Sequence, residues 1–268
     1  MISAGIDLGS GFSKAVLYRD DGVVLARAIT KTRADFDKGA RDVLDEALAL
    51  AKVSPSDVAY TCTTGLGRYA VTFRDIQVTE ITAAARGAWT LFPKASFVLD
   101  VGAQSTRAIH LRDNGKVKEF HTNEKCAAGG GAFLVRAAKY LEVPLDSLGK
   151  LSVDAKGIQP ISSVCAVLAE SEIINHVSEN VPIGDIARGM HESMADRAVG
   201  QLRKVGLNGP VTLVGGVALQ SGFVEACKRK FAIPVNLPEH PQFAAALGAA
   251  VLGMQRAKKR MAEAAACR

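Results

Sequence analysis

Asp7-Leu8-Gly9-Ser10-Gly11-Phe12-Ser13-Lys14 is the stretch that decides the fold. Hydrophobic residues at 2–8 predict a strand before it, and residues 14–18 predict another strand after it. Its small residues let backbone N–H groups approach an anion, its hydroxyls add donors, and Lys14 adds a positive charge. The common nucleotide-binding loops lead into a helix, whereas this one leads into a strand. We therefore predict a phosphate-binding turn within a strand meander, and an ordinary hairpin turn is the alternative.

The pattern of this stretch returns about ninety residues later. A buried strand is predicted at residues 95–101, and it ends in Asp100-Val101-Gly102-Ala103-Gln104-Ser105-Thr106. Two hydrophobic strands that each end in an acidic residue, one spacer and a glycine, and that each lead into further strands, indicate an internal duplication. Asp7 and Asp100 would then act on one metal–phosphate group across a cleft, with Asp7 holding Mg²⁺ through water.

A third glycine loop, Val214-Gly215-Gly216-Val217-Ala218-Leu219-Gln220, lies between a predicted strand at 211–214 and a predicted helix at 224–231. Backbone without side chains offers a flat surface against which a purine can lie, and a plain strand-to-helix turn is the alternative. Strands mixed with helices in each half predict an α/β protein with two lobes. We place the boundary near Pro93-Lys94, so that residues 1–94 with about 250–268 form lobe I and residues 95–249 form lobe II.

Composition narrows the range of functions. The chain of 268 residues is 48% hydrophobic and 22% charged, which is typical of a folded globular protein. Its net charge is +6, but aromatic residues make up only 6% and do not alternate with basic ones, so we expect no nucleic-acid partner. No apolar run reaches transmembrane length and no basic leader precedes the first strand. We therefore expect a cytoplasmic protein with reduced cysteines and no membrane partner.

Two of the five cysteines stand where helices are predicted to begin. Cys126 precedes Ala127-Ala128-Gly129-Gly130-Gly131, and Cys165 follows Ser162-Ser163-Val164. Unpaired N–H groups and the helix dipole favour a thiolate there, or an anionic cluster held by thiolates. An iron–sulfur cluster usually needs four thiolates, so one chain would supply half a site and a two-fold dimer the whole of it. Two buried, reduced cysteines are the alternative.

The three glycine loops, in this order, resemble those of the actin, sugar-kinase and heat-shock chaperone ATPase superfamily, in which they are called the phosphate 1, phosphate 2 and adenosine loops. The resemblance implies an actin-like ATPase fold, with two ribonuclease-H-like lobes and a site for ATP or ADP in the cleft between them. It also implies that Asp7 and Asp100 are the catalytic residues that serve Mg²⁺ and water. Nucleotide contacts are implied for the three loops and their neighbours: Gly9, Ser10, Gly11, Phe12, Ser13, Lys14, Glu80, Gly102, Ala103, Gln104, Gly129, Gly130, Gly131, Gly215, Gly216, Val217 and Gln220.

A narrower resemblance surrounds the cysteines. Lys125-Cys126-Ala127-Ala128-Gly129-Gly130-Gly131 and Ser162-Ser163-Val164-Cys165-Ala166-Val167-Leu168-Ala169-Glu170 look like the ATPase component of 2-hydroxyacyl-CoA dehydratases and benzoyl-CoA reductases, and similar segments extend from Gly5 to Ala250. The resemblance implies that Cys126 and Cys165 ligate one 4Fe-4S cluster shared with an identical or homologous ATPase subunit. It further implies reduced ferredoxin or flavodoxin as the electron donor and a separate catalytic acyl-CoA reductase as the acceptor.

The phosphate 2 loop departs from this family. Many members have Asp-Ile-Gly-Gly-Gln-Asp, whereas this chain has Ala103 in place of a glycine and Ser105 in place of the second aspartate. The departure favours an ATPase subunit of benzoyl-CoA reductase over the activator of a 2-hydroxyacyl-CoA dehydratase. A small-molecule kinase of the same superfamily and a non-enzymatic, actin-like assembly protein stay open as more distant alternatives, and both predict a protein without iron.

Overall fold

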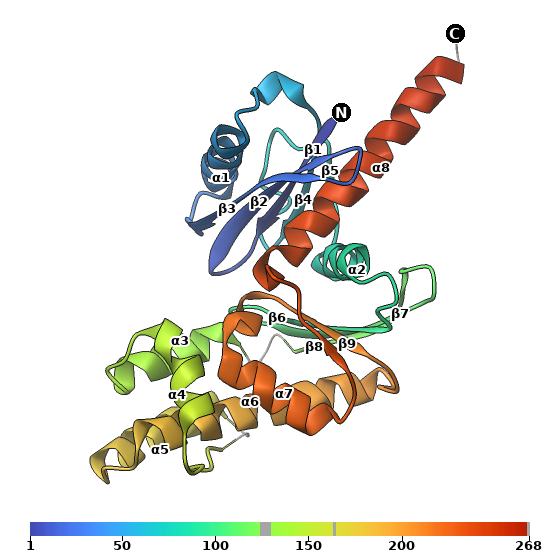
Figure 1. Ribbon diagram of the computed structural model, residues 1–268. Coiled ribbons are helices and arrows are strands. Elements are labelled where there is room, and N and C mark those ends of the chain that lie inside the picture. The colour runs from blue at the N-terminus through green and yellow to red at the C-terminus, as the bar shows by residue number, and fades with distance from the viewer. Residues whose placement is uncertain (124–129, 163–164, 267–268) are drawn as a thin grey trace. The chain divides into compact units, whose positions relative to one another are not determined.

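The computed structural model describes residues 1–123, 130–162 and 165–266 (Figure 1). Its contacts divide the chain into two compact units. Unit 1 comprises Met1–Lys94, Asn114–Lys116 and Phe243–Arg268, and unit 2 comprises Ala95–Asp113 and Val117–Gln242. The last helix lies wholly within unit 1, and it begins before the boundary at about residue 250 that the sequence suggests.

Unit 1 is built on a five-stranded sheet in the order β3-β2-β1-β4-β5. The strands are β1 (Ile2–Leu8), β2 (Phe12–Arg19), β3 (Val24–Lys31), β4 (Val58–Gly65) and β5 (Ile76–Gln77). The first three form an antiparallel meander, while β4 runs parallel to β1 and β5 runs parallel to β4. The glycine turn after β1 therefore leads into a strand, as its sequence predicts.

Helices cover both faces of this sheet, with α1 (Phe36–Ala51) on one face and α8 (Ala244–Ala266) on the other (Figure 1). Side chains alternate along β1, so Ala4, Ile6 and Leu8 join the apolar cluster that includes α1. Gly5 points the other way, where the backbone of α8 lies too close for a Cβ. Asp7 follows Gly5 at a spacing of two and therefore lies on the α8 face, at the end of β1.

A third helix of unit 1, α2 (Glu80–Leu91), packs closely against α8. The contact is made by small residues: a Cβ on Gly248 of α8 would lie 2.7 Å from the backbone nitrogen of Gly87 in α2. Two helices can approach this closely only where neither carries a side chain at the crossing. A short 3₁₀ turn, Pro55–Asp57, precedes β4.

Unit 2 repeats the sheet topology of unit 1. Its strands are β6 (Phe97–Val101), β7 (Thr106–Leu111), β8 (Val117–Asn123), β9 (Val211–Val214) and β10 (Val235–Asn236), in the order β10-β9-β6-β7-β8. Again three strands form an antiparallel meander, and again the next strand, β9, runs parallel to the first. This repeat is consistent with the duplication that the two acidic motifs indicate.

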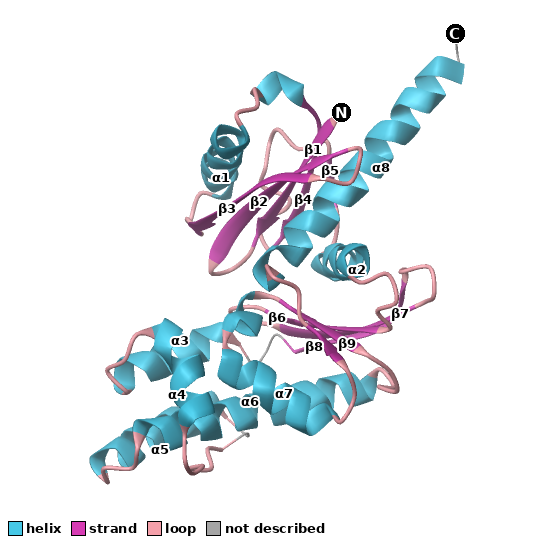
Figure 2. Ribbon diagram, in the orientation of Figure 1, coloured by secondary structure: helices cyan, strands magenta, loops and turns pink. Residues whose placement is uncertain are grey.

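In the part of unit 2 that the structure describes, the helices (Figure 2) are α3 (Gly131–Tyr140), α4 (Leu148–Asp154), α5 (Ala166–Ser178), α6 (Ile183–Lys204) and α7 (Ser221–Phe231). They form one apolar core with the sheet, in which Phe97, Phe133 and Phe223 are almost completely buried. Short 3₁₀ turns occur at Leu145–Ser147, Gly216–Leu219 and Pro241–Phe243. None of the described helices is both long and apolar enough to cross a membrane.

Candidate functional site

The phosphate 1 loop joins β1 to β2 around a buried carboxylate. Asp7 is 8% exposed, and its register partner on β2 is Lys14. Lys14 Nζ donates to Asp7 Oδ2 at 3.0 Å and to the Phe12 carbonyl at 3.3 Å. The hydroxyl of Thr32 donates to the Gly9 carbonyl at 2.8 Å, which ties the turn to the end of β3. In this arrangement the lysine that the sequence assigns to an anion is paired with Asp7.

The end of β4 lies directly beside Asp7. The parallel register pairs Asp7 with Thr64, and a Cβ on Gly65 would lie 2.7 Å from Asp7 Oδ1. Gly65 has φ +89°, a conformation that residues with side chains rarely adopt. Glycine is therefore required here both by the backbone angle and by the carboxylate.

Arg68 links this segment to Glu80, the first residue of α2. Its guanidinium donates to the Gly65 carbonyl at 2.9 Å and lies 3.9 Å from the Glu80 carboxylate. Of these residues only Glu80 is predicted from the sequence, and Thr64, Gly65 and Arg68 are not. The available signal is Gly65 and Gly67 immediately after a buried strand, the same arrangement as Gly9 and Gly11 after β1.

The phosphate 2 loop carries a matching pair in unit 2. Asp100 is 7% exposed on β6, and Arg107, its register partner on β7, donates to Asp100 Oδ2 at 3.1 Å. Arg107 is a further residue that the sequence motifs do not predict. Within the turn, the Gly102 N–H donates to the Ser105 carbonyl at 2.9 Å, so Ala103 and Gln104 form its tip.

Two further glycine segments converge on this loop within unit 2. The N–H groups of Gly131 and Ala132, at the start of α3, donate to the carbonyls of Gly102 and Ala103 at 2.9 and 2.8 Å. Gly215, with φ +90°, lies where a Cβ would be 2.6 Å from Asp100 Oδ1. The structure therefore brings together predicted residues from the phosphate 2 loop, the start of α3 and the adenosine loop.

Other predicted residues of unit 2 lie around this convergence. Gly130 approaches Ala103 so closely that a Cβ would lie 2.5 Å from its carbonyl oxygen, and a Cβ on Gly131 would lie 3.3 Å from a methyl group of Val217. Gln220 is turned toward the short helix before α4, because its Nε2 donates to the Leu145 carbonyl at 3.2 Å. Gly129 lies outside the described residues.

Cys165 caps the start of α5 and is half-buried. The pKa of its thiol is lowered, first by the nearby backbone N–H groups of Leu168 and Val167 and then by the nearby Arg197. These are the unpaired N–H groups of a helix N-terminus, which stabilise a thiolate. Cys126, the other predicted ligand, lies outside the described residues.

The buried cysteines Cys62 and Cys227 have thiol pKa values that are raised rather than lowered. Burial raises the pKa of Cys62 to about 12 and also raises that of Cys227, so both remain thiols. In the described ranges, no group of three or more histidine, cysteine and acidic side chains gathers as a metal site would require.

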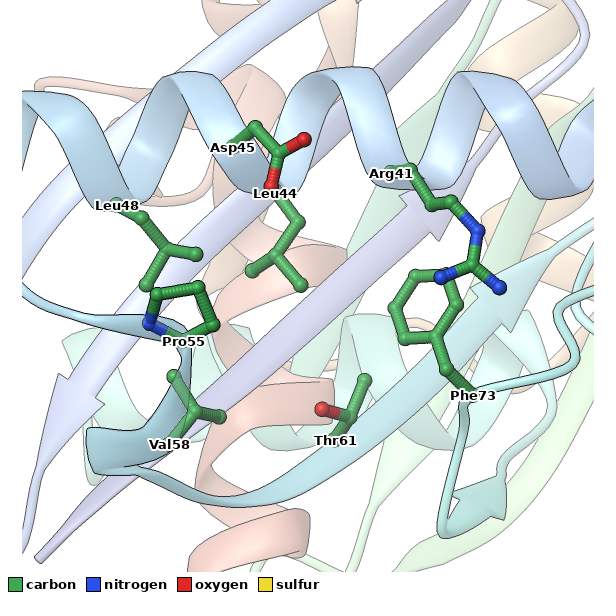
Figure 3. A pocket seen from close by; sticks show the side chains of 8 residues that line it. All are labelled: Arg41, Leu44, Asp45, Leu48, Pro55, Val58, Thr61 and Phe73. Atoms are coloured by element: carbon green, nitrogen blue, oxygen red, sulfur yellow. The ribbon is translucent and has the colours of Figure 1, made fainter.

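A pocket of about 240 Å³ lies elsewhere in unit 1, between α1 and β4 (Figure 3). Leu44 and Leu48 of α1 line it together with Val58 of β4, and the Arg41 guanidinium stacks 4.5 Å above the Phe73 ring at one end. None of its lining residues belongs to the predicted nucleotide or cysteine sites.

Comparison with known proteins identifies relatives that match over the full length. The activator of lactoyl-CoA dehydratase from Anaerotignum propionicum is 38% identical over 97% of this chain and 100% of its own, and a benzoyl-CoA reductase component from Thauera aromatica is 39% identical over 96% and 95%. The solved structure of the activator of 2-hydroxyisocaproyl-CoA dehydratase from Clostridium difficile, with bound ADPNP, has a TM-score of 0.94 and 35% identity over 98% of both chains.

These matches confirm the actin-like ATPase fold that the three glycine loops predict. More distant structures, such as a glucokinase from Streptomyces griseus with a TM-score of 0.58 and 14% identity, share the fold alone. Residues 4–253 match the BadF/BadG/BcrA/BcrD ATPase family. Because this match covers nearly the whole chain and the relatives above exceed 30% identity, the protein belongs to the BadF/BadG/BcrA/BcrD ATPase family.

Proposed function

We propose that this chain is the ATP-hydrolysing activator of a 2-hydroxyacyl-CoA dehydratase. The activator uses ATP to drive a low-potential electron into the dehydratase. The observation that carries the proposal is full-length similarity to dehydratase activators, including one structure with a TM-score of 0.94. The phosphate 2 departure favours benzoyl-CoA reductase when the sequence is considered alone. The full-length similarity to dehydratase activators favours the dehydratase activator instead.

The nucleotide part of the proposal is supported by the two acidic loops. Asp7 and Asp100 end equivalent strands, and carboxylate oxygens, directly or through water, are the ligands that Mg²⁺ prefers. Backbone N–H groups around Gly9 to Gly11 and around Gly102 would hold phosphates, and the backbone at Gly215 and Gly216 would face the purine. ATP supplies the free energy that makes the electron transfer favourable. The ADPNP in the Clostridium difficile activator supports this assignment.

The electron-transfer part is supported by Cys165. A half-buried thiol whose pKa is lowered by helix N–H groups has the chemistry of a cluster ligand. With Cys126 as the second ligand, one chain would provide two thiolates, and an identical or homologous subunit would provide the other two. A 4Fe-4S cluster so held is a one-electron carrier that reduced ferredoxin or flavodoxin can load.

A protein partner near Cys165 is supported by the surface of α5. Val167 and Leu168 lie in its first turn and are 69% and 53% exposed, and Ile174 two turns later is 48% exposed. Apolar side chains gathered on one exposed helix indicate a contact surface. We assign this surface to the second ATPase subunit or to the catalytic acyl-CoA enzyme.

The test is ATP-dependent activation under anaerobic conditions. Purified chain, Mg²⁺-ATP and a reduced ferredoxin are added to a resting lactoyl-CoA or 2-hydroxyisocaproyl-CoA dehydratase, and dehydration is followed over time. We expect activation by the wild type and by the control variant Cys62→Ala, but none by Cys165→Ser. If Cys165→Ser activates as well as the wild type, the cluster role is wrong.

Benzoyl-CoA reductase remains the second candidate, because of Ala103 and Ser105 in the phosphate 2 loop and the 39% identity to the reductase component from Thauera aromatica. This candidate predicts that the chain copurifies with further reductase subunits in a stable complex that reduces an aromatic acyl-CoA. A free homodimer that activates a dehydratase and leaves benzoyl-CoA unchanged would rule it out.

A further inference from the structure

The hydroxyl group of Thr64 is buried and has no hydrogen-bond partner among the described residues. Thr64 lies next to the end of β4, its side chain is 0% exposed, and Oγ1 makes no hydrogen bond to any part of the chain that the structure describes. An unpaired buried hydroxyl lowers stability, and valine would fill the same space without that cost. A threonine at this position therefore calls for an explanation beyond packing.

The explanation lies in its neighbours across the sheet. The strand registers pair Asp7 with Lys14 on β2 and with Thr64 on β4, so the three residues form one row on the α8 face. Paired residues on neighbouring strands point to the same face and lie within reach of one another.

The two oxygens of Asp7 are placed differently within this row. Oδ2 is bound by Lys14 Nζ at 3.0 Å, from the β2 side. Oδ1 faces the end of β4, since a Cβ on Gly65 would lie 2.7 Å from it. Thr64, on the β4 side, is thus next to the carboxylate oxygen that the lysine does not hold.

We propose that Thr64 is a positioning residue for Asp7, whose hydroxyl donates to the carboxylate when Lys14 turns to a phosphate. The inference rests on the proposed ATP hydrolysis. The lysine stem is flexible and its ammonium is a compact charge that an arriving phosphate attracts. When Lys14 leaves, Asp7 loses its fixed orientation unless a second donor replaces it, and a rotation about one side-chain bond of Thr64 supplies that donor.

Two substitutions separate this role from packing. Thr64→Val keeps the shape and removes the hydroxyl, whereas Thr64→Ser keeps the hydroxyl and removes a buried methyl group. We expect Thr64→Val to lower kcat for Mg²⁺-ATP hydrolysis about tenfold, with KM for ATP within about twofold of the wild type and an equal or higher Tm. We expect Thr64→Ser to keep a kcat near that of the wild type and to lower Tm, because it leaves a small cavity.

A positioning role predicts that Thr64→Val has the lower kcat of the two variants, while Thr64→Ser has the lower Tm. A Thr64→Val variant with wild-type kcat would overturn the inference, and so would a pair of variants whose activities simply follow their Tm values. A wild-type chain that binds ATP but never hydrolyses it, with its partner enzyme present, would overturn the proposed function and this inference together. Loss of the Thr64 effect alone overturns only the inference.

Discussion

Each acidic loop contains a carboxylate bound by a base seven residues later, on the next antiparallel strand. The bases differ: Lys14 holds Asp7, whereas Arg107 holds Asp100. A guanidinium fixes a carboxylate through its planar fork, while an ammonium on a flexible stem moves easily to another anion. We therefore expect Asp100 to keep its partner when nucleotide binds and Asp7 to exchange it.

The sequence motifs do not predict these pairs, but their common spacing of seven residues follows from the short turn that each pair spans. A tight turn between antiparallel strands sets the register, so a residue at a strand end faces a predictable position on the next strand. The positions of Thr64 and Gly65 cannot be predicted in this way. Their place beside Asp7 depends on the parallel pairing of β1 with β4, which are separated by the whole of α1, and no local pattern specifies that pairing.

His191 makes the stability of unit 2 depend on pH. It is completely buried in α6, and this burial lowers its pKa from 6.5 to about 4. Because the folded pKa is the lower one, the unfolded chain gains a proton first as pH falls. The folded state is therefore most stable with respect to His191 above pH 6.5, and it loses this stability progressively between pH 6.5 and 4. The total loss is about 3 kcal/mol in the free energy of unfolding.

The measurement is urea unfolding of the wild type and of His191→Leu from pH 7 to pH 4.5. We expect the wild type to lose more stability over this range than the variant, which has no imidazole to protonate. Parallel curves for wild type and His191→Leu would contradict the assignment.

At the scale of elements, the contact between α2 and α8 depends on glycine. The sequence shows the small residues of both helices, but the contact joins segments about 160 residues apart, and periodicity cannot reveal which helix meets which. The length of an element also limits whether it can be predicted from the sequence. The helix α4 has seven residues and β5 has two, too few for a hydrophobic period to stand out, and periodicity predicts neither.

A matched pair of substitutions tests the glycine contact. In Gly248→Ala the new methyl would meet the backbone of α2, with the Gly87 nitrogen 2.7 Å away, so the helices must separate. We expect Tm to fall by about 5 °C, although alanine favours a helix. In Gly200→Ala, within α6, no described atom outside the local helix lies within 4 Å, so the same change should raise Tm. Equal shifts in both variants would refute the packing argument.

At the scale of the whole molecule, the repeated topology explains why two short motifs predict the fold. The orders β3-β2-β1-β4-β5 and β8-β7-β6-β9-β10 are equivalent, and Asp7 and Asp100 end equivalent strands. A motif of three residues carries little information alone, but the same motif after the first strand of two similar meanders is specific. The sequence does not resolve the choice between dehydratase activator and reductase component, because that choice depends on a partner enzyme rather than on this fold.

The cluster proposal makes a prediction about the assembly as a whole. Two thiolates per chain cannot complete a four-ligand cluster, so iron must join two chains. For a homodimer we expect about two iron atoms and two sulfides per chain, a dimer in anaerobic analytical ultracentrifugation, and dissociation to monomers when an iron chelator is added under reducing conditions.

Cys165→Ser is the variant that distinguishes this assembly from an ordinary dimer. It should be a monomer without iron, whereas Cys227→Ala should keep both the iron and the dimer, because Cys227 is buried inside unit 2 and its raised pKa keeps it a thiol. If the natural partner is a homologous subunit, the chain expressed alone will contain no iron and will acquire it only on coexpression. Four iron atoms on a monomer, or an iron-free dimer with full activating power, would contradict a shared cluster.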